Sequence, residues 1–78
     1  MPAERRALAR TVRELRAREG LTQEQLADAS GVSRAMVTEL ESGRRGATFE
    51  RVVCLARGLD IPLDDFARTF MARLDEGR

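Results

Sequence analysis

The sequence predicts an all-α domain, because helical periodicity and helix-capping signals recur along its whole length. Apolar residues return every three or four positions in five separate stretches of the 78-residue chain, which is the spacing of one helix face. Thr22, Ser33 and Thr48 stand where an N-cap is expected, and Gly20 and Gly31 stand where a helix should stop. At this length we expect one domain, residues 1–78, whose small core a second copy would help to stabilise.

The first helix is expected from Ala3 to Glu19. Leu8, Val12 and Leu15 recur at i, i+4 and i+7 and form its apolar face, and Arg and Glu fill most other positions. Gly20 ends the helix. We interpret the arginines of this segment as a mostly solvated face.

The second helix begins after Thr22, whose hydroxyl forms a capping box with Gln25 three residues later. Leu26 and Ala29 are predicted to face the core. The helix stops at Ser30-Gly31, because glycine adopts the positive φ that a tight turn requires.

The third helix is capped by Ser33 and ends at Gly43. Its apolar residues fall on one face, which predicts that this face is buried. The buried set is Met36, Val37 and Leu40. The outward set is Ser33, Arg34, Ala35, Thr38 and Glu41.

These two helices carry the residues of a helix-turn-helix. Two helices that cross steeply through a short turn need a small residue at their contact, a glycine at the corner and aliphatic residues beneath the second helix. Ala27, Gly31, Val37 and Leu40 occupy those places. The alternative, two helices that merely pack, needs the apolar positions but not the combination of Gln23, Gly31 and Ser33.

The phrase Leu-Thr-Gln-x-x-Leu-Ala…Gly-Val-Ser-x-x-x-Val-Thr-x-Leu-Glu-x-Gly resembles the Cro and phage-repressor (XRE-like) helix-turn-helix family. The resemblance implies a compact five-helix, lambda-repressor-like DNA-binding domain with the helix-turn-helix formed by helices 2 and 3. The stretch SRxxVTxLExGRR and the small size are most similar to controller proteins of restriction–modification systems, which bind their own promoters as dimers.

The fourth helix is expected from Phe49 to Arg57, with Thr48 as its cap and Gly58 closing it. Its predicted inward residues are Phe49, Val52, Val53, Leu55 and Ala56. The fifth helix is expected over about residues 62–75, with Pro62 in its first turn. The last residues, Asp75 to Arg78, are expected to fray.

The fifth helix has an apolar stripe longer than one small core needs, which predicts a homodimer through this helix and the connection before it. The expected interface residues are Leu59, Ile61, Phe66, Phe70, Met71 and Leu74. The alternative is that Phe70 folds back on the first helix of its own chain.

A helix-turn-helix places its second helix in the major groove of DNA. The expected DNA-contacting residues are Gln23, Ser33, Arg34, Ala35, Thr38, Arg44, Arg45 and Thr48. Arg34 suits guanine O6 and N7, and Ala35 offers its methyl to thymine. By resemblance to the family, Gln23 anchors to a phosphate. Glu39 and Glu41 are expected to be structural, with Glu41 holding Arg44 or Arg45.

The charge distribution fits a DNA-binding protein better than the net charge of +1 does. Up to Arg57 the chain has 11 Arg and 8 acidic residues, whereas from Gly58 on it has 3 Arg and 5 acidic residues. The basic part therefore contains the helix-turn-helix, as attraction to phosphate requires. The expected partners are double-stranded operator DNA, a second copy and, for an activator, RNA polymerase.

Several function classes are not expected. The sequence has no His, no paired carboxylates in an apolar setting and no glycine-rich phosphate loop, so we expect no catalytic or metal site, no cofactor and no small-molecule ligand. Cys54 is interpreted as a buried core thiol. No segment reaches the about 20 apolar residues of a membrane span, and no signal peptide precedes the first helix, so a cytoplasmic location is expected. The alternative functions are an antitoxin-type protein-interaction module that sequesters a toxin, and a small phage-type repressor.

Overall fold

The computed structural model describes residues 1–77, and over that range it contains five α-helices. They are α1 (Ala3–Arg18), α2 (Gln23–Ser30), α3 (Arg34–Glu41), α4 (Phe49–Gly58) and α5 (Leu63–Glu76). The all-α prediction is confirmed, and the helix bounds lie within one or two residues of those expected. Helix α5 continues past Asp75, where fraying was expected to begin, and Arg78 lies outside the described residues.

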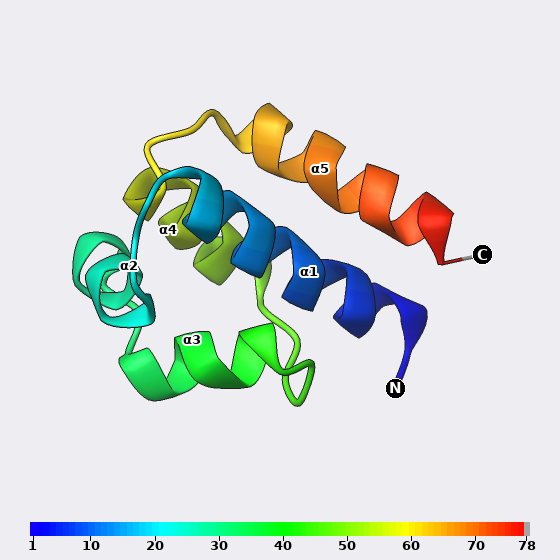
Figure 1. Ribbon diagram of the computed structural model, residues 1–78, viewed down its shortest axis with the longest axis horizontal. Coiled ribbons are helices and arrows are strands. Elements are labelled where there is room, and N and C mark those ends of the chain that lie inside the picture. Colours follow the sequence, from blue (N-terminus) through cyan, green and yellow to red (C-terminus); the bar gives the residue numbers. More distant parts are fainter. Residues whose placement is uncertain (78) are drawn as a thin grey trace.

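Helix α1 is the centre of the arrangement. It packs against α3 on one side and α5 on the other, while α2 packs against α3 and α4 (Figure 1). The start of α1 and the end of α5 lie at the same end of the molecule, and α3 and α5 are on opposite sides of α1 (Figure 1). Helix α3, which is expected to enter DNA, is therefore supported by α1 and α2, and α5 lies on the other side of α1.

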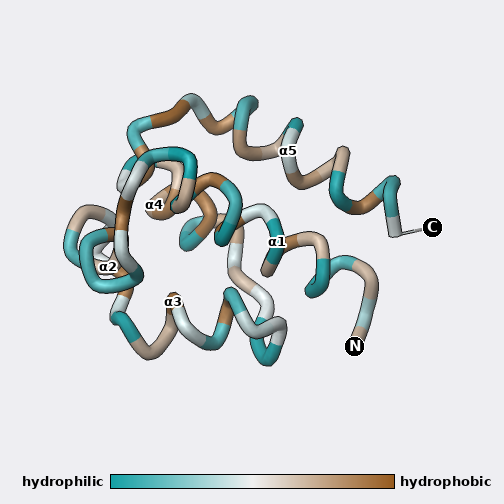
Figure 2. The backbone as a smooth tube through the Cα atoms, viewed as in Figure 1, coloured by the Kyte–Doolittle hydropathy of each residue, from teal (hydrophilic) through white to brown (hydrophobic). Residues whose placement is uncertain are grey.

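The core is formed by apolar residues from all five helices, and many of the residues on the outside of the molecule are hydrophilic (Figure 2). Most of its residues come from the predicted helix faces, as the 3.6-residue periodicity indicates, but Leu59 comes from the connection before α5. The largest fully buried apolar side chains are Val12, Leu15, Leu26, Val37, Leu40, Leu55 and Leu59. Over the described residues, none of the helices is long and apolar enough to cross a membrane.

The predicted caps of α2 and α3 are present. Thr22 accepts a hydrogen bond from the Gln25 backbone N–H at 3.0 Å, and Gln25 Oε1 accepts one from the Thr22 N–H at 2.9 Å. Ser33 Oγ accepts from the Met36 N–H at 3.1 Å. Between them Gly31 has φ 75°, as predicted for the corner of the motif. The local sequence thus fixes where both helices start and how the chain turns.

Gly58 has a different role from the one predicted. It belongs to α4, and the left-handed residue in the following turn is Asp60, with φ 56°. A Cβ atom at position 58 would lie 2.7 Å from Ser30 Cβ and 2.9 Å from Ser30 N. Glycine is needed here because the ends of α2 and α4 approach backbone to backbone.

Two residues predicted to face the core do not. Ala29 is exposed on α2. Phe49 is 73% exposed, because it is the first residue of α4 and side chains in a first turn point back toward the helix start. Pro62 is the N-cap residue of α5 rather than part of its first turn.

Candidate nucleic-acid interface

Helix α3 has one anchored face and one free face. Val37 and Leu40 are fully buried, whereas Arg34, Ala35 and Thr38 are exposed. The N-cap Ser33 is exposed at the start of the helix. The structure therefore presents the four predicted base-facing residues together, on a helix that the core holds in place.

Gln23 links α2 to this free face. Its Nε2 donates a hydrogen bond to Glu41 Oε1 at 3.1 Å, and its Oε1 accepts one from Thr38 Oγ1 at 3.0 Å. Two of the predicted DNA-contacting residues, Gln23 and Thr38, are thus joined directly. Their contact fixes the start of α2 against the middle of α3.

Glu41 was predicted to point outward and to hold Arg44 or Arg45, and both predictions are wrong. Glu41 is 4% exposed, and its carboxylate accepts hydrogen bonds from Arg16 Nε at 2.6 Å and Arg16 Nη2 at 3.0 Å. Arg16 Nη1 also donates to the Leu21 carbonyl at 2.8 Å. Hydrogen bonding to Glu41 raises the pKa of Arg16 above its ordinary, strongly basic value, so the guanidinium stays charged in any normal assay.

The loop after α3 is fixed by α1. Arg13 Nη1 donates to the Glu41 carbonyl at 2.7 Å, and Arg5 Nη1 donates to the Arg44 carbonyl at 3.2 Å. Cations at the carbonyl end of a helix are stabilising, because they complement the helix dipole. The side chain of Arg44 is exposed, and that of Arg45 lies 3.5 Å from Glu39 across an exposed ion pair.

The starts of α3 and α4 open onto the same hollow, of about 500 Å³. Ser33 lies on one side and Thr48 on the other, where Thr48 Oγ1 accepts from the Arg51 N–H at 3.2 Å. Two helix N-termini therefore face one region of the surface beside the exposed face of α3. Cys54 also lines this hollow and is half-buried, not the fully buried thiol predicted.

Two helices joined through a glycine corner, the second with one face buried and the other exposed, are the arrangement of a helix-turn-helix. The sequence model of the family described as Helix-turn-helix matches residues 12–66. The chain belongs to this helix-turn-helix family. It has the fold of DNA-binding regulators, and the predicted resemblance is confirmed.

Solved structures agree with that assignment. The clp gene regulator ClgR from C. glutamicum is 32% identical, with a TM-score of 0.82 over 92% of this chain and 94% of that one. The restriction-modification controller protein C.AhdI from Aeromonas hydrophila is 35% identical, with a TM-score of 0.78 over 83% and 98%. The controller protein C.Esp1396I, at 20% identity, shares the fold, with a TM-score of 0.90 over 97% and 99%. Comparison with curated proteins found no match.

Arg13 and Arg16 were not predicted to support the helix-turn-helix. A signal for Glu41 was nonetheless present, because it lies four residues after Val37 and one after Leu40, in phase with the buried face of α3. A carboxylate at such a position needs a cation. Arg16, next to Leu15 on the edge of the apolar face of α1, was the available partner.

The predicted dimer residues divide into three groups by their exposure. Leu59 and Phe66 are 0% and 2% exposed within one chain, so they belong to its core and the prediction that they form an interface is wrong. Ile61 and Phe70 pack partly against the core, and Phe70 thus follows the alternative in which it folds back on its own chain. Leu74 is half-buried, and Met71 is 48% exposed.

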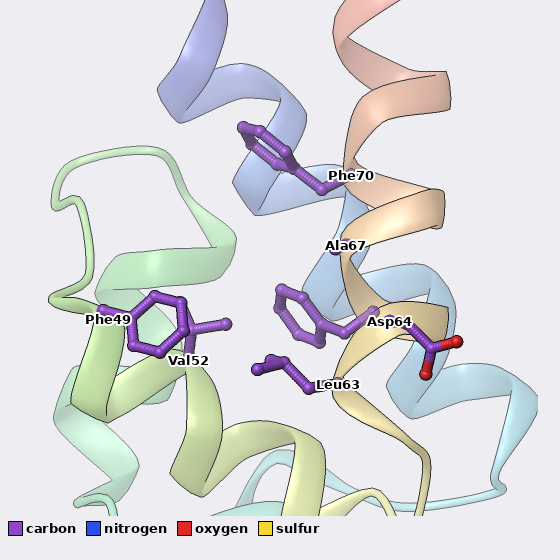
Figure 3. A pocket seen from close by; sticks show the side chains of 7 residues that line it. Phe49, Val52, Leu63, Asp64, Ala67 and Phe70 are labelled. Atoms are coloured by element: carbon purple, nitrogen blue, oxygen red, sulfur yellow. The ribbon is translucent and has the colours of Figure 1, made fainter.

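An apolar groove of about 540 Å³ lies between α4 and α5 of this helix-turn-helix domain (Figure 3). Phe49 and Val52 approach it from α4, and Leu63 and Phe70 approach it from α5 (Figure 3). The most exposed of these residues is Phe49, which was predicted to face the core. The groove places an exposed aromatic ring and an apolar hollow on the same face of the molecule.

Proposed function

We propose that this protein is a sequence-specific DNA-binding transcriptional regulator that acts as a homodimer. The observation that carries the proposal is the exposed face of Arg34, Ala35 and Thr38 on a helix that Glu41 and Arg16 fasten from behind. Rigid support of this kind suits recognition, because base contacts require side chains held in a fixed position. The similarity to ClgR and C.AhdI supports the regulator class.

In the proposed complex α3 enters the major groove with its first turn against the base edges. Arg34 pairs with guanine O6 and N7, and Ala35 contacts a thymine methyl group. The free hydrogen of the Gln23 amide reaches a phosphate. Arg44, Arg45 and the N-terminus of α4 at Thr48 contact the backbone, which sets the position of the domain without reading sequence.

The second copy is proposed to pack on the face that carries the α4–α5 groove. Phe49 and the hollow beside it lie on one surface, so two copies related by a twofold axis would each offer a ring to the other's groove. Met71 extends the exposed apolar surface of α5. A twofold dimer presents two α3 helices to successive major grooves, about 34 Å apart, and so recognises a palindrome.

We further propose that the operator lies upstream of the protein's own gene, as for a restriction–modification controller that first activates and then represses. The 35% identity to C.AhdI, together with coverage of 98% of that chain, supports this subtype. RNA polymerase is the partner proposed for the activating step. A nuclease footprint of that upstream DNA should show a protected palindrome, and a second adjacent site would favour the controller over a simple repressor.

To test whether α3 reads the DNA sequence, the affinities of Arg34→Ala and Arg68→Ala for DNA are compared. Arg34→Ala should weaken binding to the footprinted site by about 5- to 100-fold and change binding to unrelated DNA little, because a bidentate guanine contact is lost. Arg68 lies on α5, on the far side of α1 from α3, and its loss removes the same charge (Figure 1). Equal losses on both DNAs would reassign Arg34 to a phosphate, and the lack of any protected site would refute the proposal.

A further inference from the structure

The directions of the hydrogen bonds between α2 and α3 are set by Glu41. An ionised carboxylate accepts hydrogen bonds and donates none. Glu41 is 4% exposed and paired with the Arg16 guanidinium, whose raised pKa keeps it charged. The part of the Gln23 side chain that contacts Glu41 must therefore be its NH₂ group, as observed at 3.1 Å.

With its NH₂ group held by Glu41, the Gln23 amide turns its oxygen toward Thr38. Thr38 Oγ1 donates to that oxygen at 3.0 Å. A threonine hydroxyl has one hydrogen and two lone pairs. Once the hydrogen is used inside the protein, the exposed side of the Thr38 hydroxyl has only acceptor capacity left.

The other threonines within helices show that this arrangement is particular to Thr38. Thr11 Oγ1 donates to the Ala7 carbonyl at 2.7 Å, and Thr69 Oγ1 donates to the Asp65 carbonyl at 3.1 Å. Both bonds run four residues back along the same helix, which is the usual choice for a helical threonine. Thr38 instead donates across to another helix, so its hydroxyl is oriented by Gln23 and not by its own backbone.

We infer that Thr38 selects a base with an exocyclic amino group in the major groove, adenine N6 or cytosine N4, and disfavours the carbonyls of guanine and thymine. This inference rests on the proposed function, since it assumes that α3 reads base edges. The major groove displays these amino groups as donors and guanine O6 and thymine O4 as acceptors, so an acceptor-only hydroxyl distinguishes them. Gln23 and Glu41 are positioning residues, which act through the direction they impose on Thr38.

The experiment selects preferred sites from a randomised DNA duplex with the full chain and with Thr38→Val and Thr38→Ser. The wild type should prefer adenine or cytosine at one position in each half-site. Thr38→Val, which keeps the shape but loses the hydroxyl, should reduce that preference by about 2- to 10-fold, the contribution of a single neutral hydrogen bond. Thr38→Ser should retain it. If the preference were for thymine through the threonine methyl group, Thr38→Val would keep it and Thr38→Ser would lose it, which would overturn the inference.

Base analogues identify which amino group is bound. If the selected base is adenine, purine, which lacks the 6-amino group, should weaken wild-type binding and leave Thr38→Val unaffected. If it is cytosine, pyrimidin-2-one, which lacks the 4-amino group, should do the same. An analogue that weakens both proteins equally shows that another side chain contacts the amino group, and it overturns the inference.

Gln23→Met tests the positioning role. It removes the Gln23 acceptor for the Thr38 hydrogen, so the hydroxyl is no longer held in one direction: it can donate to the carbonyl four residues back in α3 or to a base carbonyl. The ratio of binding to amino-bearing and carbonyl-bearing sites should fall toward one although Thr38 is retained, whereas a merely structural role would lower affinity for all sites alike. Selection of a specific site without any Thr38-dependent preference refutes this inference alone. Failure of the wild type to select any site refutes the proposed function and the inference together.

Discussion

Replacing Arg16 with methionine removes the guanidinium that neutralises Glu41. The Glu41 carboxylate would then accept a side-chain hydrogen bond from Gln23 alone, in a residue that is only 4% exposed. Removing one partner of a buried ion pair costs about 3–5 kcal/mol, because an uncompensated charge remains inside. A domain of this length is stable by about 4–12 kcal/mol, so Arg16→Met should lose a large share of its stability. The melting temperature should fall by about 12–40 °C.

Companion variants make this expectation specific, with stability measured by thermal and urea unfolding under one set of conditions. Arg16→Met combined with Glu41→Met should be clearly more stable than Arg16→Met alone, since a buried pair replaced by apolar residues of similar volume is often neutral. The control Arg10→Met breaks a pair whose side chains are about half exposed, so solvent screening limits its cost to less than about 1 kcal/mol. A loss below about 1 kcal/mol for Arg16→Met, or a double variant no better than the single one, would refute the reasoning.

Three further outcomes are expected. Gly58→Ala should lower the free energy of unfolding, measured with urea, by about 1–3 kcal/mol because the added Cβ would overlap Ser30. Gly46→Ala should change that free energy little, because no atom lies nearer than 3.9 Å to the added Cβ. Phe49→Glu should convert the dimer to monomer in sedimentation without lowering the stability of the monomer, since the ring is 73% exposed in one chain; an unchanged sedimentation coefficient would place the dimer surface elsewhere. Arg45→Gln should reduce the slope of log K against log salt by about 1 and preserve site preference, and a changed preference would move Arg45 to a base edge.

The sequence predicted most of the fold because the decisive signals are local. The capping box at Thr22, the cap at Ser33 and the corner at Gly31 depend on residues at most three positions apart, and each is present in the structure. The helix faces followed from periodicity in the same way. The residues expected to read DNA needed only the helix phase, so the periodicity of α3 was enough to place Arg34 and Thr38 on its free face.

What the sequence did not predict depends on distant partners. Glu41 is buried because Arg16, 25 positions earlier in the chain, reaches it, and periodicity alone does not reveal that pairing. Gly58 is needed because α2 passes beside it. The assignment of Phe66 and Phe49 was reversed for a related reason. An apolar residue satisfies the same pattern whether it packs inside one chain or lies on its surface. Where α4 begins and how α5 packs on α1 decide which.

Of the exposed residues on α3, Thr38 is hydrogen-bonded to another helix and Arg34 and Ala35 lie on the first turn; this difference bears on how a regulator of this kind could acquire new DNA targets. Arg34 and Ala35 are exposed on the first turn of the helix, whereas Thr38 is bonded to Gln23 and through it to the interior. Under the proposed function, substitutions at positions 34 and 35 should therefore alter the recognised DNA sequence at little cost to folding stability. Related domains could therefore evolve to bind different operators by substitutions at positions 34 and 35. A substitution at position 38 would also have to preserve the hydrogen bonds that link it through Gln23 to Glu41.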